Sequence, residues 1–503
     1  MFDKLKIKSK GSKIGPASPA ATPGKAPSKK QIYQSRLNFG VNIGACFVME
    51  KWIFHELFPD GADCELEAVS KLVEQNGEKD AQKKFEHHWT NFMNDDDWKW
   101  LQDHHVDSVR VPIGYWEVGG GKYAKGTKFE KYAKSVYSNA WDIFKKEFIE
   151  KAGKHNISVV VDIHGLPKGA NGSDHSGEKS GGEAGFWNCQ ESQLLVCEML
   201  EFIASDLKKY ENIAAIQIVN EAEFANDPKR QSRYYAAGIS LIRKADREVP
   251  VVISDGWWPD QWVKWVQDNQ SDGESLGVVV DHHCYRCFSD DDKKKSPQSI
   301  IGDLDKDLLT NLTDNGRGVD FMVGEYSCVL DGDSWGKDGA NDKRDNLVVD
   351  YGRRQVDLIS QRASFGSFFW TFKFQSGNGG EWDFRTMFDK GAIQPPLSIK
   401  GKQVPDESVF KQKLDNAFGG HSDYWNKQNS KEKYEHDRYK DGFTTAWKDS
   451  LEFAKFDGSV IGRTGAWKAA RLAEHIKDKG LLKFIWEWEQ GFDAGLKEFL
   501  SSF

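Results

Sequence analysis

Two glutamates stand at the ends of apolar, β-branched runs, where a carboxyl group can serve chemistry. Glu221 ends the run IAAIQIVNE, and Glu325 lies in the run DFMVGEYS. Two carboxyl groups about 5–5.5 Å apart can cleave a β-glycosidic bond with retention of configuration, one as proton donor and the other as nucleophile. Glu221 is the candidate general acid/base and Glu325 the candidate nucleophile, if the fold brings them together.

Other polar side chains end similar runs. They are Arg110 in SVRVPIG, His164 in SVVVDIHG, and His283 and Tyr285 in GVVVDHHCY. A fixed guanidinium keeps a neighbouring carboxylate ionised and oriented, and imidazoles and phenols hydrogen-bond sugar hydroxyls or a nucleophile. Each residue also has a structural interpretation, as a buried salt bridge for Arg110 and as satisfied core histidines for His164 and His283.

Eight runs of this kind recur along the chain. They cover residues 38–45, 108–114, 158–165, 213–221, 250–257, 277–285, 320–327 and 365–373. Near-continuous apolar character is typical of parallel strands buried on both faces. Amphipathic segments such as residues 129–148 separate most of the runs and are interpreted as helices.

This alternation predicts an α/β fold, a closed (β/α)8 TIM barrel, with a doubly wound open sheet as the alternative. No Gly-x-Gly-x-x-Gly follows a run, which disfavours a dinucleotide-binding fold. Barrel enzymes keep their active sites where the carboxyl ends of the strands meet, so we expect the polar residues to converge there. Trp370, in the last run, is either barrel packing or the floor on which a sugar ring rests.

The chain is expected to divide into three segments. Residues 1–35, rich in Lys, Pro, Ser, Gly and Ala, predict a flexible tail. Residues 36–395 carry the eight runs and predict the (β/α)8 catalytic domain, with an insertion at residues 46–105 near the barrel mouth. Residues 396–503 show helical patterns and predict a helical C-terminal extension packed on the barrel.

Composition restricts the partners. The net charge of -8 is spread over mixed-sign segments, which argues against a nucleic-acid or anionic-membrane surface and favours a neutral carbohydrate. Nineteen Trp also suit sugar binding, although core packing accounts for about half of them. No apolar run reaches the roughly 20 residues of a membrane-spanning helix, and the start lacks the apolar stretch of a signal peptide. We therefore expect a cytoplasmic protein with no integral membrane segment.

The cysteines do not predict a disulfide framework or a metal centre. They are seven in number, scattered, and best interpreted as reduced thiols. Cys284 and Cys287 form a C-x-x-C, but no second pair accompanies it at zinc-like spacing. We expect neither a cofactor nor a metal.

The chain resembles glycoside hydrolase family 5, and more closely its fungal exo-β-1,3-glucanase branch. The matching segments are NFGVNIGACFVMEKWI, HHWTNFMNDDDWKWL, SVRVPIGYW, VVVDIHG with NGSDHSG, IVNEAEF, DHHCYRCF, VGEYS and FFWTFKF with GGEWDF, spanning about residues 36–395. The resemblance implies a retaining mechanism and these active-site positions: Arg110, His164, Asn220, Glu221, His283, Tyr285, Glu325 and Trp370. It also implies that Asn220 hydrogen-bonds the 2-hydroxyl of the sugar and that Glu50 binds the distal hydroxyls of the same sugar.

Three positions depart from this branch. Its members clamp the leaving-group sugar between two Phe residues; Phe288 matches one, but Ser173 stands at the other position. His175 replaces an expected Asn, and Cys46 replaces a Trp. The catalytic residues are thus better matched than the specificity for β-1,3-glucan.

The leading functional hypothesis is an exo-β-1,3-glucanase or β-glucosidase acting on a β-1,3-glucan oligosaccharide or another β-glucoside. One alternative is a β-glucosidase for glucosylated lipids such as glucosylceramide or steryl glucoside, because a missing clamp admits a different leaving group. The other is a catalytically inactive carbohydrate-binding protein, which the presence of both carboxylates with their Arg, His and Tyr neighbours disfavours.

Overall fold

The computed structural model describes residues 14, 17, 24–270, 274–310, 319–396 and 399–503. Eight described strands pair in parallel in sequence order, and β8 pairs with β1 to close a barrel. The strands are β1 (Asn38–Asn42), β2 (Ser108–Gly114), β3 (Ser158–Gly165), β4 (Ile213–Gln217), β5 (Val251–Ser254), β6 (Val278–Arg286), β7 (Asp320–Leu330) and β8 (Gly366–Phe369). The predicted (β/α)8 barrel is confirmed, and the open sheet was wrong.

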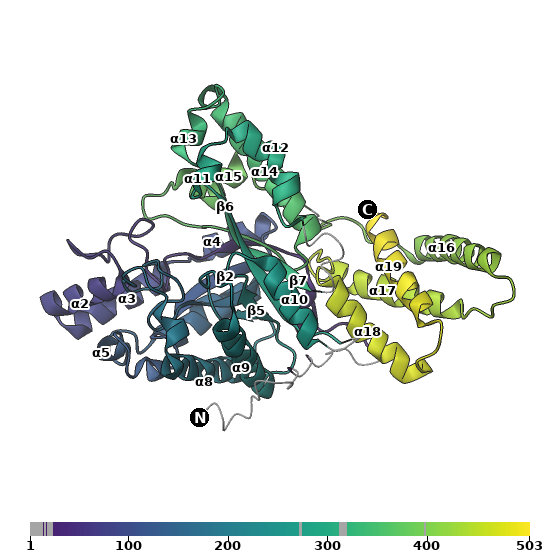
Figure 1. Ribbon diagram of the computed structural model, residues 1–503, viewed down its shortest axis with the longest axis horizontal. Helices are drawn as coiled ribbons and strands as arrows, with labels where there is room; N and C mark the ends of the chain where they lie inside the picture. The colour runs from purple at the N-terminus through teal and green to yellow at the C-terminus, as the bar shows by residue number, and fades with distance from the viewer. Residues whose placement is uncertain (1–13, 15–16, 18–23, 271–273, 311–318, 397–398) are drawn as a thin grey trace.

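Helices surround the strands (Figure 1). Those before β5 are α1 (Lys29–Ser35), α2 (Glu65–Asn76), α3 (Glu78–Asn91), α4 (Asp95–Asp103), α5 (Glu130–Ala133), α6 (Ala140–Ile143), α7 (Lys151–Lys154), α8 (Gln190–Leu207) and α9 (Lys229–Ala245). Those after β5 are α10 (Pro259–Asn269), α11 (Asp290–Lys293), α12 (Pro297–Asp307), α13 (Gly332–Trp335), α14 (Arg344–Arg362), α15 (Phe384–Asp389), α16 (Glu407–Gln428), α17 (Asp437–Lys455), α18 (Thr464–Lys479) and α19 (Ile485–Leu500).

The amphipathic segment 129–148 is not the single helix that its spacing suggests. It forms α5, a set of turns, α6 and a π-helical turn at Phe144–Glu150 that runs into α7. Its aromatic residues are buried all the same, since Phe129, Tyr137 and Phe148 are each fully enclosed. The spacing of the apolar residues correctly indicated which side chains are buried, but buried side chains do not require an unbroken helix.

Alternate residues of each strand face the barrel interior, as the two-residue period of a strand requires. An apolar cluster shared by different strands lies at one level; its members include Val160, Ala215, Val279 and Met322. Two residues further along, the same strand faces carry Asp162, Gln217 and Asp281. Two residues further again they carry His164 and His283. The interior therefore changes from apolar to charged toward the carboxyl ends of the strands, and this gradient positions the site.

The C-terminal helices pack together through close helix contacts. Gly442 of α17 and Gly491 of α19 face backbone of the opposite helix, and a Cβ at either position would lie 2.0 Å from a carbonyl oxygen there. Glycine therefore permits this approach of α17 to α19. Figure 1 shows α16–α19 gathered at the opposite end of the molecule from α2 and α3.

These helices attach to the barrel at the amino ends of its strands. The N–H of Leu37, just before β1, donates to the Val460 carbonyl at 2.8 Å. The Arg463 guanidinium donates to the carboxylate of Asp320, the first residue of β7, also at 2.8 Å, and both side chains are buried. The C-terminal helices therefore lie on the side of the barrel away from the mouth formed by the carboxyl ends of its strands.

The prediction of a flexible tail over residues 1–35 was wrong at its end. Residues 29–35 form α1, and Ile32 and Tyr33 are buried. Ser28 and Gln31 make a reciprocal capping box at its start, a signal that the tail's composition obscured. Most of the earlier tail lies outside the described residues. Within the described ranges, no helix combines the length and apolar character needed to cross a membrane.

Candidate active site

A cavity of about 880 Å³ opens at the carboxyl ends of the strands. Its lining residues include Glu50, Trp52, His164, Ser173, His175, Asn220, Glu221, Trp257, Tyr285, Phe288, Glu325, Trp370 and Trp382. Arg110 and His283 are buried and contact the lining carboxylates. All ten site residues expected from the sequence are thus brought to one place, from elements as distant as the β1–α2 loop and β8.

The two glutamates face each other across this cavity. Carboxylate oxygens of Glu221 and Glu325 lie within 4.8 Å of each other, with a ring nitrogen of His283 within the same distance of both. An inverting glycosidase needs roughly 6.5–9.5 Å between its carboxyl groups, to leave room for a water. The shorter spacing here suits direct attack by one carboxylate on the anomeric carbon while the other serves the leaving group.

Glu325 is held by two donors, one to each oxygen. Arg110 Nη1 donates to Oε1 at 3.0 Å, and the Tyr285 hydroxyl donates to Oε2 at 2.9 Å. Both contacts fix the orientation of the carboxylate, which lines the cavity from the middle of β7. An ionised, immobilised carboxylate is what nucleophilic attack requires.

Arg110 is itself fixed on every side by residues of the neighbouring strands. Its guanidinium donates to Gln217 Oε1 at 2.8 Å, to Asn42 Oδ1 at 2.8 Å and to Asn220 Oδ1 at 2.7 Å, and it pairs with Asp162 at 3.0 Å. Sequence reasoning assigned no role to Asn42, Asp162 or Gln217. Each lies two residues from another residue of its strand that faces the barrel interior, and this spacing predicts that its own side chain faces the interior as well.

Glu221 lies just beyond the end of β4 and is contacted by two histidines. His283 Nδ1 lies 2.8 Å from Oε1, and His175 Nε2 lies 3.2 Å from Oε2. Burial raises the pKa of the Glu221 carboxyl, but the hydrogen bonds from His175 and His283 outweigh it and hold that pKa well below its ordinary value. Burial likewise lowers the pKa of His175, but Glu221 outweighs it and raises that pKa to about 9.

His283 connects Glu221 to the charged layer below. Its Nε2 lies 3.0 Å from Asp281 Oδ2 while its Nδ1 faces Glu221, so both ring nitrogens meet carboxylates. Burial lowers the pKa of His283, but Glu325 and Asp281 outweigh it and raise that pKa well above its ordinary value. Both ring nitrogens then donate, and the imidazolium balances the surrounding carboxylates. Asp281 was not singled out from the sequence, although it directly precedes the two histidines of β6.

The backbone at Glu221 is strained. Its φ angle is 41°, in the left-handed region that non-glycine residues seldom adopt. Asn171 Nδ2 donates to the Glu221 carbonyl at 2.7 Å and so connects this residue to the loop that carries Ser173 and His175. The loop therefore reaches the cavity, where Ser173 and His175 are lining residues.

Aromatic rings form the walls of the cavity. Trp370 is buried and stacks on His164, with ring centroids 5.9 Å apart and an interplanar angle of 12°. Trp52, Trp257 and Phe288 are exposed, at 52%, 49% and 65%. Phe288 and Tyr285 meet edge to face at 5.5 Å. Trp52, Trp257 and Trp382 are lining residues that sequence reasoning had not assigned.

Comparisons with known proteins agree with this geometry. A family model described as cellulase (glycosyl hydrolase family 5) matches residues 73–376, and one described as the C-terminal domain of glucan 1,3-beta-glucosidase 3 matches residues 407–503. An uncharacterized glycosyl hydrolase of Saccharomyces cerevisiae is 40% identical over 99% of this chain and 98% of its own. The glucan 1,3-beta-glucosidase 3 of Schizosaccharomyces pombe is 36% identical over 93% of this chain and 96% of its own.

A solved structure supports the fold. The rutinosidase from Aspergillus niger superposes with a TM-score of 0.55 at 17% identity, covering 72% of this chain and 98% of that one. Together with the barrel, the paired carboxylates and the match over residues 73–376, these similarities lead to one conclusion. The chain belongs to glycosyl hydrolase family 5, whose members are retaining glycosidases.

Proposed function

We propose that the chain hydrolyses terminal β-glucosidic bonds of β-1,3-glucan oligosaccharides and related β-glucosides, with Glu325 as nucleophile and Glu221 as general acid/base. The observation that carries this proposal is the position of Glu325, held by Arg110 and Tyr285 with an oxygen within 4.8 Å of Glu221. The name of the Schizosaccharomyces pombe relative, glucan 1,3-beta-glucosidase 3, supports the substrate class.

The mechanism follows from the contacts of the two carboxyl groups. Glu325 attacks the anomeric carbon as Glu221 passes a proton to the departing glycosidic oxygen, which leaves a covalent glycosyl–enzyme. Glu221 then removes a proton from water, and the water oxygen displaces Glu325 from the anomeric carbon. Two displacements restore the β configuration. His175 and His283 hold Glu221 in place, and His175 stores the proton that the Glu221–His175 pair shares in the free enzyme.

The remaining lining residues are assigned to the sugar. Asn220, held by Arg110, hydrogen-bonds the 2-hydroxyl, and His164 and Glu50 bind hydroxyls further from the bond that breaks. Trp370 supports the apolar face of the ring. Trp52 Nε1 donates to Glu50 Oε2 at 2.8 Å, which orients the Glu50 carboxylate at one end of the cavity.

A comparison of substrates tests the proposal. Laminarioligosaccharides, an aryl β-glucoside, glucosylceramide and steryl glucoside are assayed in parallel, and the anomer first released is read by NMR. The proposal expects release of β-glucose from the nonreducing end of laminarioligosaccharides. Hydrolysis of the two lipids alone would contradict the glucan assignment, and binding without hydrolysis of any substrate would support the inactive carbohydrate-binding alternative.

Hydrolysis of glucosylated lipids is the second candidate, because of one feature of the cavity rim. Ser173 lines the cavity where the related glucanases carry one Phe of the clamp, while Trp257 and Phe288 remain exposed nearby. An open rim with exposed aromatic faces accepts an apolar leaving group as readily as a second sugar.

Restoring the missing ring should shift the preference toward glucan. Ser173→Phe adds a second aromatic face for the leaving-group sugar, with an expected gain of about 1 kcal/mol, or roughly fivefold in kcat/KM. The gain is expected for laminaribiose and not for the aryl β-glucoside, whose leaving group does not need a sugar clamp. Ser173→Ala serves as the control and should leave the ratio of the two substrates unchanged. An equal effect of Ser173→Phe on both substrates would show that an aromatic ring at position 173 does not clamp the leaving-group sugar.

His175 should set the upper limit of the active pH range. Because the His175–Glu221 pair keeps its shared proton up to the His175 pKa of about 9, the basic limb of kcat/KM should lie near that pH. In His175→Asn, Glu221 alone must keep the proton, so the basic limb should move to lower pH. The pH profile of aryl β-glucoside hydrolysis measures this shift. His55→Asn is the control, because His55 is exposed and lies outside the cavity lining, and it should leave the pH profile unchanged. An unchanged profile in His175→Asn would mean that His175 and Glu221 do not share a proton.

We further propose that the enzyme acts in the cytoplasm. The seven cysteines carry free thiols, and all except Cys189 are buried, which suits a reducing compartment. Fractionation of cells expressing the tagged full chain tests this, since recovery from the culture medium would contradict it.

A further inference from the structure

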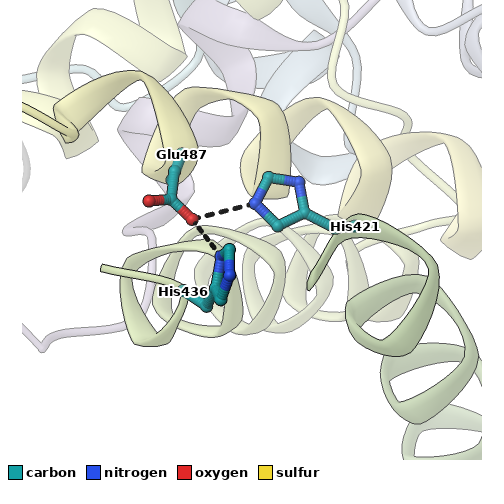
Figure 2. A group of neighbouring side chains, drawn as sticks. All are labelled: His421, His436 and Glu487. Carbon is teal, nitrogen blue, oxygen red and sulfur yellow. Dashed lines mark hydrogen bonds and ion pairs between the residues drawn. The ribbon is translucent and has the colours of Figure 1, made fainter. Parts of the chain in front are cut away.

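A second cluster of titratable side chains lies in the C-terminal helices, on the side of the barrel away from the cavity. One oxygen of Glu487, Oε2, lies 2.9 Å from His421 Nε2 and 2.6 Å from His436 Nδ1. Figure 2 shows both imidazoles pointing at this single oxygen. His421 comes from α16, His436 from the turn before α17, and Glu487 from the first turn of α19. Three separate segments thus direct ligand-type atoms to one point.

The charge of Glu487 needs a positive partner in this cluster. Its side chain is fully buried, and those of His421 and His436 are 5% and 17% exposed. In the described chain, the ion pairs of Glu487 are with these two histidines and include no Lys or Arg. A buried carboxylate without a fixed cation is costly. Either a protonated imidazole or a bound metal ion must therefore supply the charge.

The surrounding hydrogen bonds favour the metal. The ring nitrogen of His436 that points away from Glu487, Nε2, lies 3.2 Å from Asn426 Oδ1. When Nε2 donates its hydrogen to that oxygen, a neutral ring has a bare lone pair at Nδ1, aimed at Glu487. Metal-bound histidines are held in the same way, by a carbonyl or carboxylate at the opposite ring nitrogen.

The other parts of the cluster are also fixed. The Glu435 N–H donates to Glu487 Oε1 at 2.8 Å, which leaves Oε2 as the oxygen that faces the histidines. Tyr439 stacks on the His421 ring with centroids 4.0 Å apart. Neighbouring ligands of a tetrahedral zinc ion lie roughly 3.3 Å apart, so the imidazoles need to move outward by about 0.5 Å to admit one.

We propose that His421, His436 and Glu487 bind a Zn²⁺ ion that fastens α16 to α17 and α19. Two imidazole nitrogens and one carboxylate oxygen are ligands that zinc prefers, with a water at the fourth position. The apolar residues of the 22-residue α16, such as Phe410 and Leu414, are only partly buried against the neighbouring helices. A helix held by partly buried contacts gains from such a link, and the place of the cluster, on the side of the barrel away from the cavity, separates the ion from the glycosidase reaction. The spacing of residues 421, 436 and 487 along the chain matches no short metal-binding motif. The sequence accordingly predicted no metal.

Metal content is the first test. The full chain is purified without chelator, its zinc is measured by mass spectrometry, and the apo protein is titrated with Zn²⁺ alone. Wild type should bind one equivalent, and Glu487→Gln and His421→Asn should each lose it. Glu498→Gln is the matched control, since Glu498 is also on α19 and pairs with Lys413 of α16 at 2.7 Å, yet contacts no histidine. It should retain the zinc. Asn426→Ala, which removes only the partner of His436, should weaken binding by roughly 10-fold or more.

The active site must be separated from this binding, because Glu221, His283 and Glu325 also lie close enough to hold an ion. Glu221→Gln removes a ligand from the active-site group. This variant should still bind one equivalent of zinc, at His421, His436 and Glu487. Amide exchange gives a second readout: Zn²⁺ should slow exchange in α16 of wild type and Glu498→Gln, but not of Glu487→Gln. The proposal would be overturned if Glu487→Gln retained the zinc or if Glu221→Gln lost it. It would also be overturned if the wild type bound no zinc, and a protonated, metal-free triad would then supply the charge.

Discussion

Glu325→Ala is expected to abolish hydrolysis of every substrate, lowering kcat by at least about 10⁴-fold, even for aryl glucosides with excellent leaving groups. The reason is that Glu325, which Arg110 and Tyr285 hold in the cavity, is the proposed nucleophile, and alanine cannot attack the anomeric carbon in its place. The alanine leaves space for a small anion, so added formate should restore reaction with an activated β-glucoside. One displacement inverts configuration, and the rescued product should therefore be the α-anomer, as read by NMR.

The control for this loss is Glu381→Gln. Glu381 lies next to the lining residue Trp382 but pairs with Arg344 rather than with the site, so its substitution should leave kcat within severalfold of wild type. Equal thermal stability of the two variants separates a lost nucleophile from a damaged fold. Substantial residual turnover by Glu325→Ala without added anion would mean that another group is the nucleophile.

Glu221→Ala should fail in a different way. Loss of the proton donor is expected to lower kcat/KM by about 10²- to 10⁴-fold for laminarioligosaccharides, whose leaving groups need protonation. Aryl glucosides with acidic leaving groups should still form the glycosyl–enzyme, which then accumulates because water lacks its general base. Added azide needs no base and should release a β-glucosyl azide.

The contrast between substrates is the diagnostic part of this result. If Glu221→Ala lost activated and unactivated substrates to the same extent, and azide changed nothing, the acid/base assignment would be wrong. Glu223→Ala, two residues further along the same loop and outside the cavity lining, should keep the wild-type ratio of the two substrates.

Sequence patterns specified the barrel closely where a strand is buried on both faces. The run SVRVPIG matches β2 over its whole length, because continuous apolar character marks a central parallel strand. The run that ends at Glu221 was less informative. Pairing of β4 stops at Gln217, and Glu221 instead lies in a loop at positive φ, held by a hydrogen bond from Asn171. A strained loop conformation depends on residues far away in the sequence, so no periodic pattern in the local sequence predicts it.

The same reason limits what the sequence reveals of the site. His175 stood out as a departure from the related glucanases, but its contact with Glu221 depends on how a Gly-rich loop folds back over β4. Trp257 ends the predicted run 250–257, but β5 stops at Ser254, and nothing in the run marked Trp257 as a lining residue. The cluster of His421, His436 and Glu487 is assembled by the packing of three helical segments, and local spacing does not encode such packing.

Covalent trapping tests the central claim most directly, since retention through Glu325 requires a glycosyl–enzyme. The wild-type enzyme is incubated with 2,4-dinitrophenyl 2-deoxy-2-fluoro-β-glucoside, which forms the intermediate faster than water releases it, and peptides are then mapped by mass spectrometry. We expect one fluoroglucosyl group per chain, on the peptide containing Glu325, together with loss of wild-type activity, and we expect no label on Glu325→Ala. Labelling of Glu221 or of another residue, or turnover with no label at any time, would contradict the assignment of Glu325 as the nucleophile.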